Sequence, residues 1–165
     1  MRVWKVLPAS MASAAHRERD LPLGELLVRA GLVAPNDLVA ALATARAGGR
    51  RLGEILLEQG LVGDRELARL VADQEDLEFV DLGKYDLDRR ALELLSETTA
   101  RRYCAIPFRS DPGATLVAVA DPTDNEGLDA LVAEIPGGVR FVVAVRSEVE
   151  AALAEAFGEE PAEAC

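Results

Sequence analysis

The chain is poor in the residues that build metal centres, disulfide frameworks and catalytic triads. Its 165 residues include two cysteines and one histidine. His16 lies in a polar N-terminal stretch, Cys104 lies in an apolar stretch, and Cys165 is the last residue. A zinc site or a Ser-His-Asp triad would depend on this one histidine, and two such cysteines form no disulfide framework. The sequence therefore predicts no metal and no cofactor, and a reducing, cytoplasmic location is expected.

Excess positive charge, long apolar runs and catalytic signatures are also missing. The 29 acidic residues outnumber the 18 basic ones, and the net charge of −11 opposes general binding to DNA, RNA or anionic membranes. No run of about 18 uncharged apolar residues exists, which excludes a membrane-spanning helix. No phosphate-binding GxxxxGK[ST] loop occurs, and the Glu159-Glu160 pair is more simply a solvated charge run than a catalytic pair. These absences predict a protein that is not an enzyme, although a small anionic ligand could bind where basic residues cluster.

An internal repeat is the most informative feature that the sequence does have. Residues 23–45 and 52–74 resemble each other, and their identical positions are Leu23/Leu52, Gly24/Gly53, Glu25/Glu54, Leu27/Leu56, Gly31/Gly60, Leu32/Leu61, Val33/Val62 and Leu38/Leu67. The leucine spacing within each copy predicts a helix, a turn and a second helix. Gly31 and Gly60 are expected to end the first helices in the left-handed conformation, while Pro35 and Gly63 start the second ones. Residues 46–51 are the expected linker between the copies.

The remainder of the chain has the pattern of a small α/β unit. Strands are expected at 79–82, 103–108, 114–120 and 139–145, because short apolar runs there are bounded by turn residues. Helices are expected from an Asp88 cap through 95, from an Asp124 or Asn125 cap through 134, and from a Ser147 cap through 157.

These patterns predict an α+β fold with two units. A tandem helix-turn-helix repeat of four short helices comes first, followed by a small α/β sandwich of three or four strands with helices on one side. The expected organisation is a flexible leader (1–20), a helical subdomain (21–76), an α/β subdomain (77–157) and a loose acidic tail (158–165).

The second repeat also carries a motif, RLGxxLxxxGxLxxxxLxxxLxxQ, in which Val71 is a conservative departure. Its matching residues are Arg51, Leu52, Gly53, Leu56, Gly60, Val62, Leu67 and Gln74. With this motif and the later segments VADQEDLEFVDL and VAVADPTD, the chain resembles the N-terminal domain of type II secretion and type IV pilus assembly ATPases, the MshEN family. The resemblance extends over residues 21–157.

The resemblance implies binding of the bacterial second messenger cyclic di-GMP, with one repeat for each half of this two-fold symmetric ligand. Arg51 would neutralise a phosphate or bind the O6/N7 edge of guanine, and Gly53 would allow close approach of the backbone. Gln74 would donate or accept a hydrogen bond at the far side. The whole implied ligand-binding set is Leu23, Gly24, Leu27, Leu38, Leu42, Arg50, Arg51, Leu52, Gly53, Leu56, Leu67, Leu70, Gln74 and Asp121.

Many of these residues also have a purely structural interpretation, but Gly24 and Gly53 favour a functional one, because a glycine at a helix start costs stability without local benefit. The leucines are core residues in any helical pair, and Arg50 and Arg51 would form a solvated pair in an acidic protein. Asp121 is first a turn residue and alternatively a partner for the N1/N2 edge of guanine.

The first repeat departs from the motif at its polar positions, because Pro22 holds the arginine place and Ala45 the glutamine place. The arginines that lie near enough in sequence to compensate are Arg17, Arg19, Arg46 and Arg50.

Two functions remain open at this point. The first is a sensor that reports cyclic di-GMP to an attached or partner machine, which the resemblance suggests is an ATPase, a glycosyltransferase or a response regulator. The second is a docking domain that binds no nucleotide and holds a membrane-platform protein of a secretion or pilus system.

Overall fold

A computed structural model describes residues 22–158 of the chain. The expected leader and all but Gly158 of the expected acidic tail lie outside the described residues.

From residue 22 to residue 76 the structure has four helices, as the repeat predicts: α2 (Leu23–Arg29), α3 (Pro35–Gly48), α4 (Leu52–Glu58) and α5 (Asp64–Gln74). Gly31 and Gly60 have φ angles of 71° and 65°, which confirms that left-handed glycines end α2 and α4. Pro35 occupies the first turn of α3, and Gly63 is the N-cap of α5. The Gly63 N–H donates to the Glu66 carboxylate over 3.1 Å, which secures the start of α5.

The linker between the repeats is shorter than predicted. Helix α3 continues through Gly48, and Gly49, with φ 62°, is the left-handed residue after its end. Arg46 and Ala47 are good helix formers, so the helix continues until a left-handed glycine ends it. The helices pack on a core whose fully or nearly fully buried members are Leu27, Val33, Ala41, Ala45, Ile55, Leu56 and Val62.

The C-terminal part is built around a four-stranded sheet of order β1-β4-β3-β2. Its strands are β1 (Glu78–Phe79), β2 (Ala105–Asp111), β3 (Ala114–Val119) and β4 (Val139–Val143). Strands β2 and β3 form an antiparallel hairpin, whereas β4 runs parallel to both β3 and β1. The fold is therefore α+β, as predicted, and its sheet has four strands within the described part of the chain.

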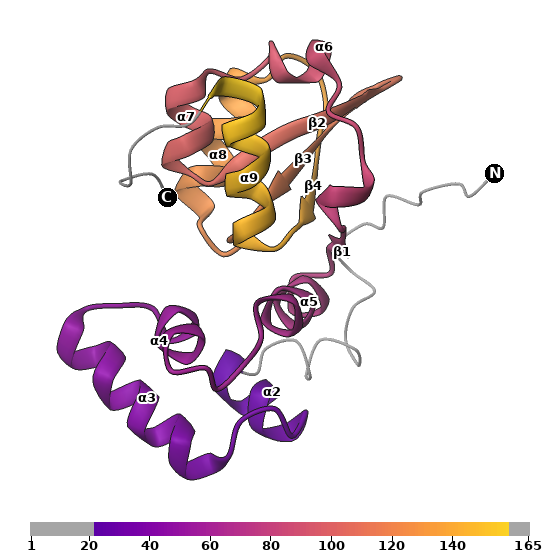
Figure 1. Cartoon of the computed structure of the whole chain (residues 1–165). Coiled ribbons are helices and arrows are strands. Elements are labelled where there is room, and N and C mark those ends of the chain that lie inside the picture. The colour runs from indigo at the N-terminus through magenta and orange to yellow at the C-terminus, as the bar shows by residue number, and fades with distance from the viewer. Residues whose placement is uncertain (1–21, 159–165) are drawn as a thin grey trace, which may run out of the picture.

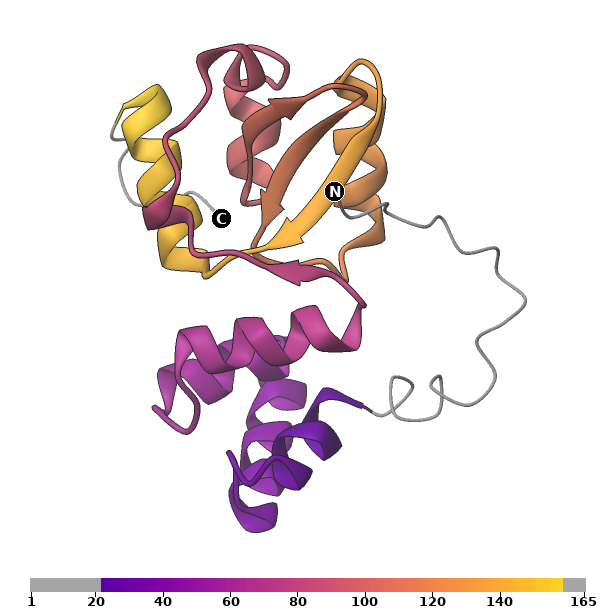
Figure 2. The ribbon, with the colours of Figure 1, turned by 90° about the vertical axis from the view of Figure 1, so that its right-hand side faces the viewer.

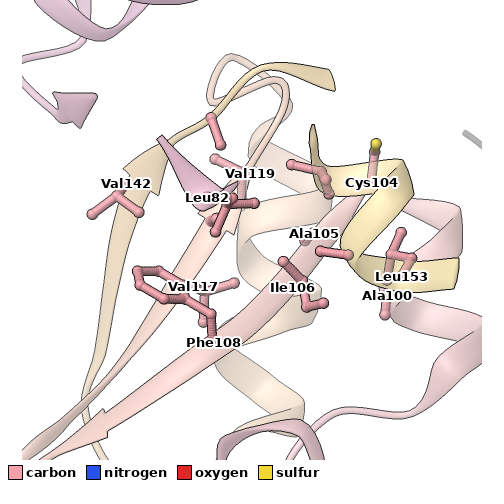
Figure 3. Packing of buried hydrophobic residues seen from close by; sticks show 14 of the residues in the cluster. Leu82, Ala100, Cys104, Ala105, Ile106, Phe108, Val117, Val119, Val142 and Leu153 are labelled. Atoms are coloured by element: carbon pink, nitrogen blue, oxygen red, sulfur yellow. The ribbon is translucent and has the colours of Figure 1, made fainter. Parts of the chain in front are cut away.

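Helices α6 (Arg89–Leu92), α7 (Glu97–Arg102), α8 (Asn125–Glu134) and α9 (Arg146–Phe157) accompany the sheet, together with a short 3-10 turn, η1 (Leu82–Lys84). Figures 1 and 2 show α7, α8 and α9 gathered on one side of the strands. The sheet and its helices share a second core, in which Ile106, Phe108, Val117, Val142 and Leu153 are at most 1% exposed (Figure 3).

Five predicted elements of this part need correction. Asp88 does cap a helix by accepting the Arg90 N–H, but that helix ends at Leu92 and not at 95. Ser147 is not a cap, because α9 already begins at Arg146 after the N-cap Val145. The predicted strands at 103–108 and 139–145 are shifted or shortened, and the strand expected at 79–82 is reduced to the two residues of β1 followed by η1. Tyr103, predicted to begin a strand, is instead the C-cap residue that follows α7, and α7 itself was not predicted.

Helix α5 connects the helical part to the sheet (Figure 1). Its Ala68 and Ala72 pack in one cluster with Val143 and Val145, at and just beyond the end of β4. The Arg65 guanidinium of α5 reaches Asp81 at 3.0 Å and Glu148 of α9 at 2.6 Å. The small side chains allow close approach, and the ion pairs fix the orientation of α5 against the α/β part. The domain boundary at 76/77 stays a prediction, although secondary structure changes there between Gln74 and Glu78.

None of the helices between residues 22 and 158 is long and apolar enough to cross a membrane.

Candidate functional site

A cavity of about 480 Å³ lies where the helical part meets the α/β part. The helical part contributes Leu23, Arg51, Leu52, Gly53, Glu54, Leu57, Asp64, Leu67, Ala68, Val71 and Gln74. The α/β part contributes Ala120, Asp121, Thr123, Ala144 and Arg146. The site therefore depends on both units, and it is built mainly by the second repeat, since Leu23 is the first repeat's one contribution to the wall.

The α/β wall is formed where two parallel strands end. Ala120 follows β3 directly, and Ala144 follows β4 directly. Because the two strands run parallel, their carboxyl ends meet at the same edge of the sheet. The crevice at that edge is the usual place for ligands in open α/β sheets.

Seven of the predicted site residues are brought together in the cavity wall: Leu23, Arg51, Leu52, Gly53, Leu67, Gln74 and Asp121. Asp121 comes from the α/β part and is far from the others in sequence. Its arrival at the same cavity follows from the packing of α5 against the end of β4.

The other seven predicted residues do not line the cavity: Gly24, Leu27, Leu38, Leu42, Arg50, Leu56 and Leu70. Leu27 and Leu56 are fully buried in the helical core. Leu38 and Leu70 pack on that core, and Leu38 covers Gly24. Leu42 is half-buried on α3.

Arg50 is directed along α4 toward two carboxylates. Its guanidinium forms hydrogen bonds of 2.8 and 2.6 Å with the two oxygens of Glu58 and lies 3.4 Å from Glu54. The hydrogen bond to Glu58 raises the pKa of Arg50, and the same contact lowers the pKa of Glu58. Arg50 therefore forms exposed ion pairs with Glu58 and Glu54, and it does not line the cavity.

Arg51 and Asp121 form an ion pair between the two units. The Asp121 Oδ1 atom accepts hydrogen bonds from the Thr123 N–H at 2.9 Å and the Thr123 hydroxyl at 2.6 Å, which confirms the expected turn. The Oδ2 atom contacts Arg51. The Arg51 side chain is 58% exposed and that of Asp121 21%, so the arginine remains accessible to a ligand.

The charges around the cavity suit a ligand with both anionic and donor groups. Arg51 and Arg146 provide positive charge, while Glu54, Asp64 and Asp121 provide acceptor oxygens. Leu52, Leu57, Leu67 and Val71 supply apolar surface. Within residues 22–158, no group of three or more His, Cys, Asp or Glu side chains is arranged to hold a metal ion.

Both motif glycines let a leucine of the following helix approach closely. A Cβ atom on Gly24 would lie 2.9 Å from Leu38 Cδ1, and one on Gly53 would lie 3.3 Å from Leu67 Cδ2. Gly53 also lines the cavity, whereas Gly24 is buried. Helix packing is therefore a role of both glycines, and contact with a ligand is open to Gly53.

Several wall residues were missed by sequence reasoning. They are Glu54, Leu57, Asp64, Ala68, Val71, Ala120, Thr123, Ala144 and Arg146. Those in the second repeat lie between motif positions, and Ala120 and Thr123 flank the predicted Asp121, so proximity to the motifs could have indicated them. For Ala144 and Arg146 the sequence carries no signal, because their place depends on the parallel pairing of β3 and β4.

The chain is similar to a family of known domains and to several known proteins. Residues 75–163 match the family model of the MshEN domain. The type IV pilus assembly ATPase PilB of Thermus thermophilus is 35% identical over 127 residues, which are 76% of this chain and 14% of PilB. Bacteriophage adsorption protein B of Escherichia coli K12 is 26% identical over 151 residues, which are 91% of this chain and 20% of that protein. The chain thus spans only a small part of the length of these curated relatives.

The similarity extends to three dimensions. The solved structure of MshE with cdg (cyclic di-GMP) superposes with a TM-score of 0.75 at 31% sequence identity. The match covers 83% of this chain and 99% of the MshE chain. A match of this length is longer than the α/β part alone, so it includes residues of the helical part as well.

Proposed function

Because the chain belongs to the MshEN domain family, we propose that it is a regulatory domain that binds cyclic di-GMP in the cavity between its two units. The observation that carries the proposal is the meeting of Arg51, Gly53 and Gln74 of the second repeat with Asp121 of the α/β part around one cavity. The similarity to MshE, which was solved with this nucleotide, supports the same ligand.

The wall chemistry matches the parts of the nucleotide. Arg51 binds a phosphate or the O6/N7 edge of guanine, and the Asp121 carboxylate accepts from the guanine N1 and N2 donors. Leu52, Leu67 and Val71 form apolar surface beneath a purine. The volume of about 480 Å³ lies within the range of about 300–1,000 Å³ that small-molecule sites occupy.

The two repeats hold the ligand unequally in this proposal. The second repeat supplies the polar contacts, and the first supplies the apolar side chain of Leu23. Ala45, at the place of the motif glutamine, is 5% exposed in the helical core and makes no polar contact with a ligand.

The domain acts by reporting the nucleotide to a larger machine in the cytoplasm. The PilB relative makes an ATPase the first candidate for the attached unit, and a glycosyltransferase or response regulator is the alternative. On this view the domain itself is regulatory and catalyses no reaction.

Calorimetric titration of the chain with cyclic di-GMP tests the proposal, with cyclic di-AMP as a control of equal charge and different base edges. We expect saturable one-site binding of cyclic di-GMP and weaker binding of cyclic di-AMP. At a free ligand concentration of 100 times Kd, linkage stabilises the fold by about 2.7 kcal/mol, which a thermal melt detects. No heat and no thermal shift at millimolar nucleotide would reject the proposal and favour the docking domain.

A further inference from the structure

The proposed site lacks one of the two cations that tandem motifs would supply. Cyclic di-GMP carries two phosphates, and the second repeat places Arg51 at the cavity. In the first repeat the corresponding residue is Pro22, the N-cap of α2, which carries no charge. A second phosphate therefore needs a cation from outside the motif, because an unpaired anion in a partly enclosed site loses hydration without compensation.

The described arginines nearest in sequence to the repeats do not meet this need. Arg50 is paired with Glu58 and Glu54 of α4, and it does not line the cavity. Arg46 is exposed on the last turn of α3, and it does not line the cavity. Arg17 and Arg19 lie outside the described residues.

Arg146 does line the cavity, and it comes from the opposite unit. It is the first residue of α9, a helix of 12 residues, and it is half-buried. Val145 immediately before it is 4% exposed and packs with Ala68 and Ala72 of α5, so the backbone that carries Arg146 is held firmly. A cation on a fixed backbone at the start of a helix is well suited to an anion, since the helix dipole adds to its charge.

We propose that Arg146 binds the second phosphate of cyclic di-GMP and replaces the arginine that the first repeat has lost. This inference rests on the proposed function. It assigns one phosphate to the helical unit through Arg51 and the other to the α/β unit through Arg146. The bound nucleotide would then connect the two units by charge.

The test is a set of calorimetric titrations of the full chain with cyclic di-GMP. Arg146→Gln should raise Kd by about tenfold to hundredfold, the loss of one charge-assisted hydrogen bond. Arg146→Lys keeps the charge and should lose clearly less. Arg109→Gln is the matched control, because Arg109 pairs with Asp111 in the β2–β3 hairpin and does not line the cavity; its Kd should equal that of the parent.

A compensating variant makes the assignment sharper. Pro22 directly precedes Leu23, which lines the cavity. Pro22→Arg should therefore recover much of the lost affinity in the Arg146→Gln background, and it should improve the parent by a smaller factor. Melting without nucleotide should give the same temperature for parent and Arg146→Lys, which keeps the comparison valid even if Arg146→Gln folds less well.

The outcomes separate this inference from the proposed function. If the parent does not bind cyclic di-GMP, the proposed function fails and the inference falls with it. If the parent binds and Arg146→Gln binds equally well, the inference alone is wrong. If Arg146→Lys is as weak as Arg146→Gln, the arginine recognises a base edge and not a phosphate, and the phosphate assignment is overturned.

Discussion

The two motif glycines provide a matched pair for separating stability from ligand binding. Each is the second residue of a helix of seven residues, and each faces a leucine of the following helix. Alanine at either position gains about 0.5–1 kcal/mol at most from reduced backbone entropy. What differs is the space for the new methyl group.

At Gly24 the methyl group would lie 2.9 and 3.1 Å from the two Cδ atoms of Leu38, so that side chain must move. Overpacking of this kind costs about 1–3 kcal/mol, which exceeds the gain. Gly24→Ala should therefore destabilise the fold by about 1–2 kcal/mol, or a few degrees in Tm. At Gly53 the one close atom is Leu67 Cδ2 at 3.3 Å, and we expect a change within about 0.5 kcal/mol.

For ligand affinity we expect the larger effect at Gly53, the opposite of the order for stability, because Gly53 lines the cavity and Gly24 does not. Gly53→Ala should weaken cyclic di-GMP binding, while Gly24→Ala should keep the Kd of the parent at temperatures where it is folded. Urea unfolding followed by circular dichroism measures the first effect, and calorimetric titration measures the second. The reasoning is refuted if Gly53→Ala is the less stable variant, or if Gly24→Ala is the one that loses affinity.

Three further predictions concern charged residues. Arg51→Ala should raise the Kd for cyclic di-GMP by about tenfold or more, whereas the Kd of Arg50→Ala should stay within about twofold of the parent. Equal Kd values for the two variants in calorimetric titrations would mean that the two arginines act only as diffuse charge. Arg65→Met should lower the thermal midpoint less than Gly24→Ala does and should increase protease cleavage near residues 75–78, since it removes the contacts of α5 with Asp81 and Glu148. The hydrogen bond from Arg65 holds the pKa of Asp81 below its usual value, so this stabilisation is complete above about pH 4 and is lost as the pH falls through the lower folded-state pKa. The thermal midpoint of the parent should therefore fall more steeply than that of Arg65→Met below pH 4, and parallel curves would contradict the assignment.

The helical part could be predicted well because its signals are local. Gly31, Gly60 and Pro35 act through their own backbone angles, which do not depend on distant contacts. Helix α7 was missed for the opposite reason. Its sequence ETTARR has no apolar periodicity, and it is held by the Ser96 cap and by the buried Ala100, which packs in the core of the α/β part. Tertiary packing decides such a short segment.

The site could be predicted only in part, because the motif mixes residues of two kinds. Leu52 and Leu67 face the cavity, while Leu27 and Leu56 hold the helices together, and their spacing in sequence does not separate these roles. Arg146 lies outside the motif altogether and reaches the site through sheet order and the docking of α5.

The position of Ala68 on helix α5 has a consequence for regulation, because this residue contacts both the cavity and the sheet. Ala68 belongs to the cavity wall and also packs with Val143 at the end of β4. A ligand bound against α5 and a displacement of the sheet would therefore both act on the packing contact between α5 and the end of β4. Thermodynamic reciprocity then applies. If an attached protein changes this packing contact, it changes the affinity for the nucleotide by the same factor by which the nucleotide changes the conformational equilibrium of that protein. If the domain is attached to a larger machine, the affinity measured on the isolated domain would therefore differ from the affinity in the assembly by that coupling factor.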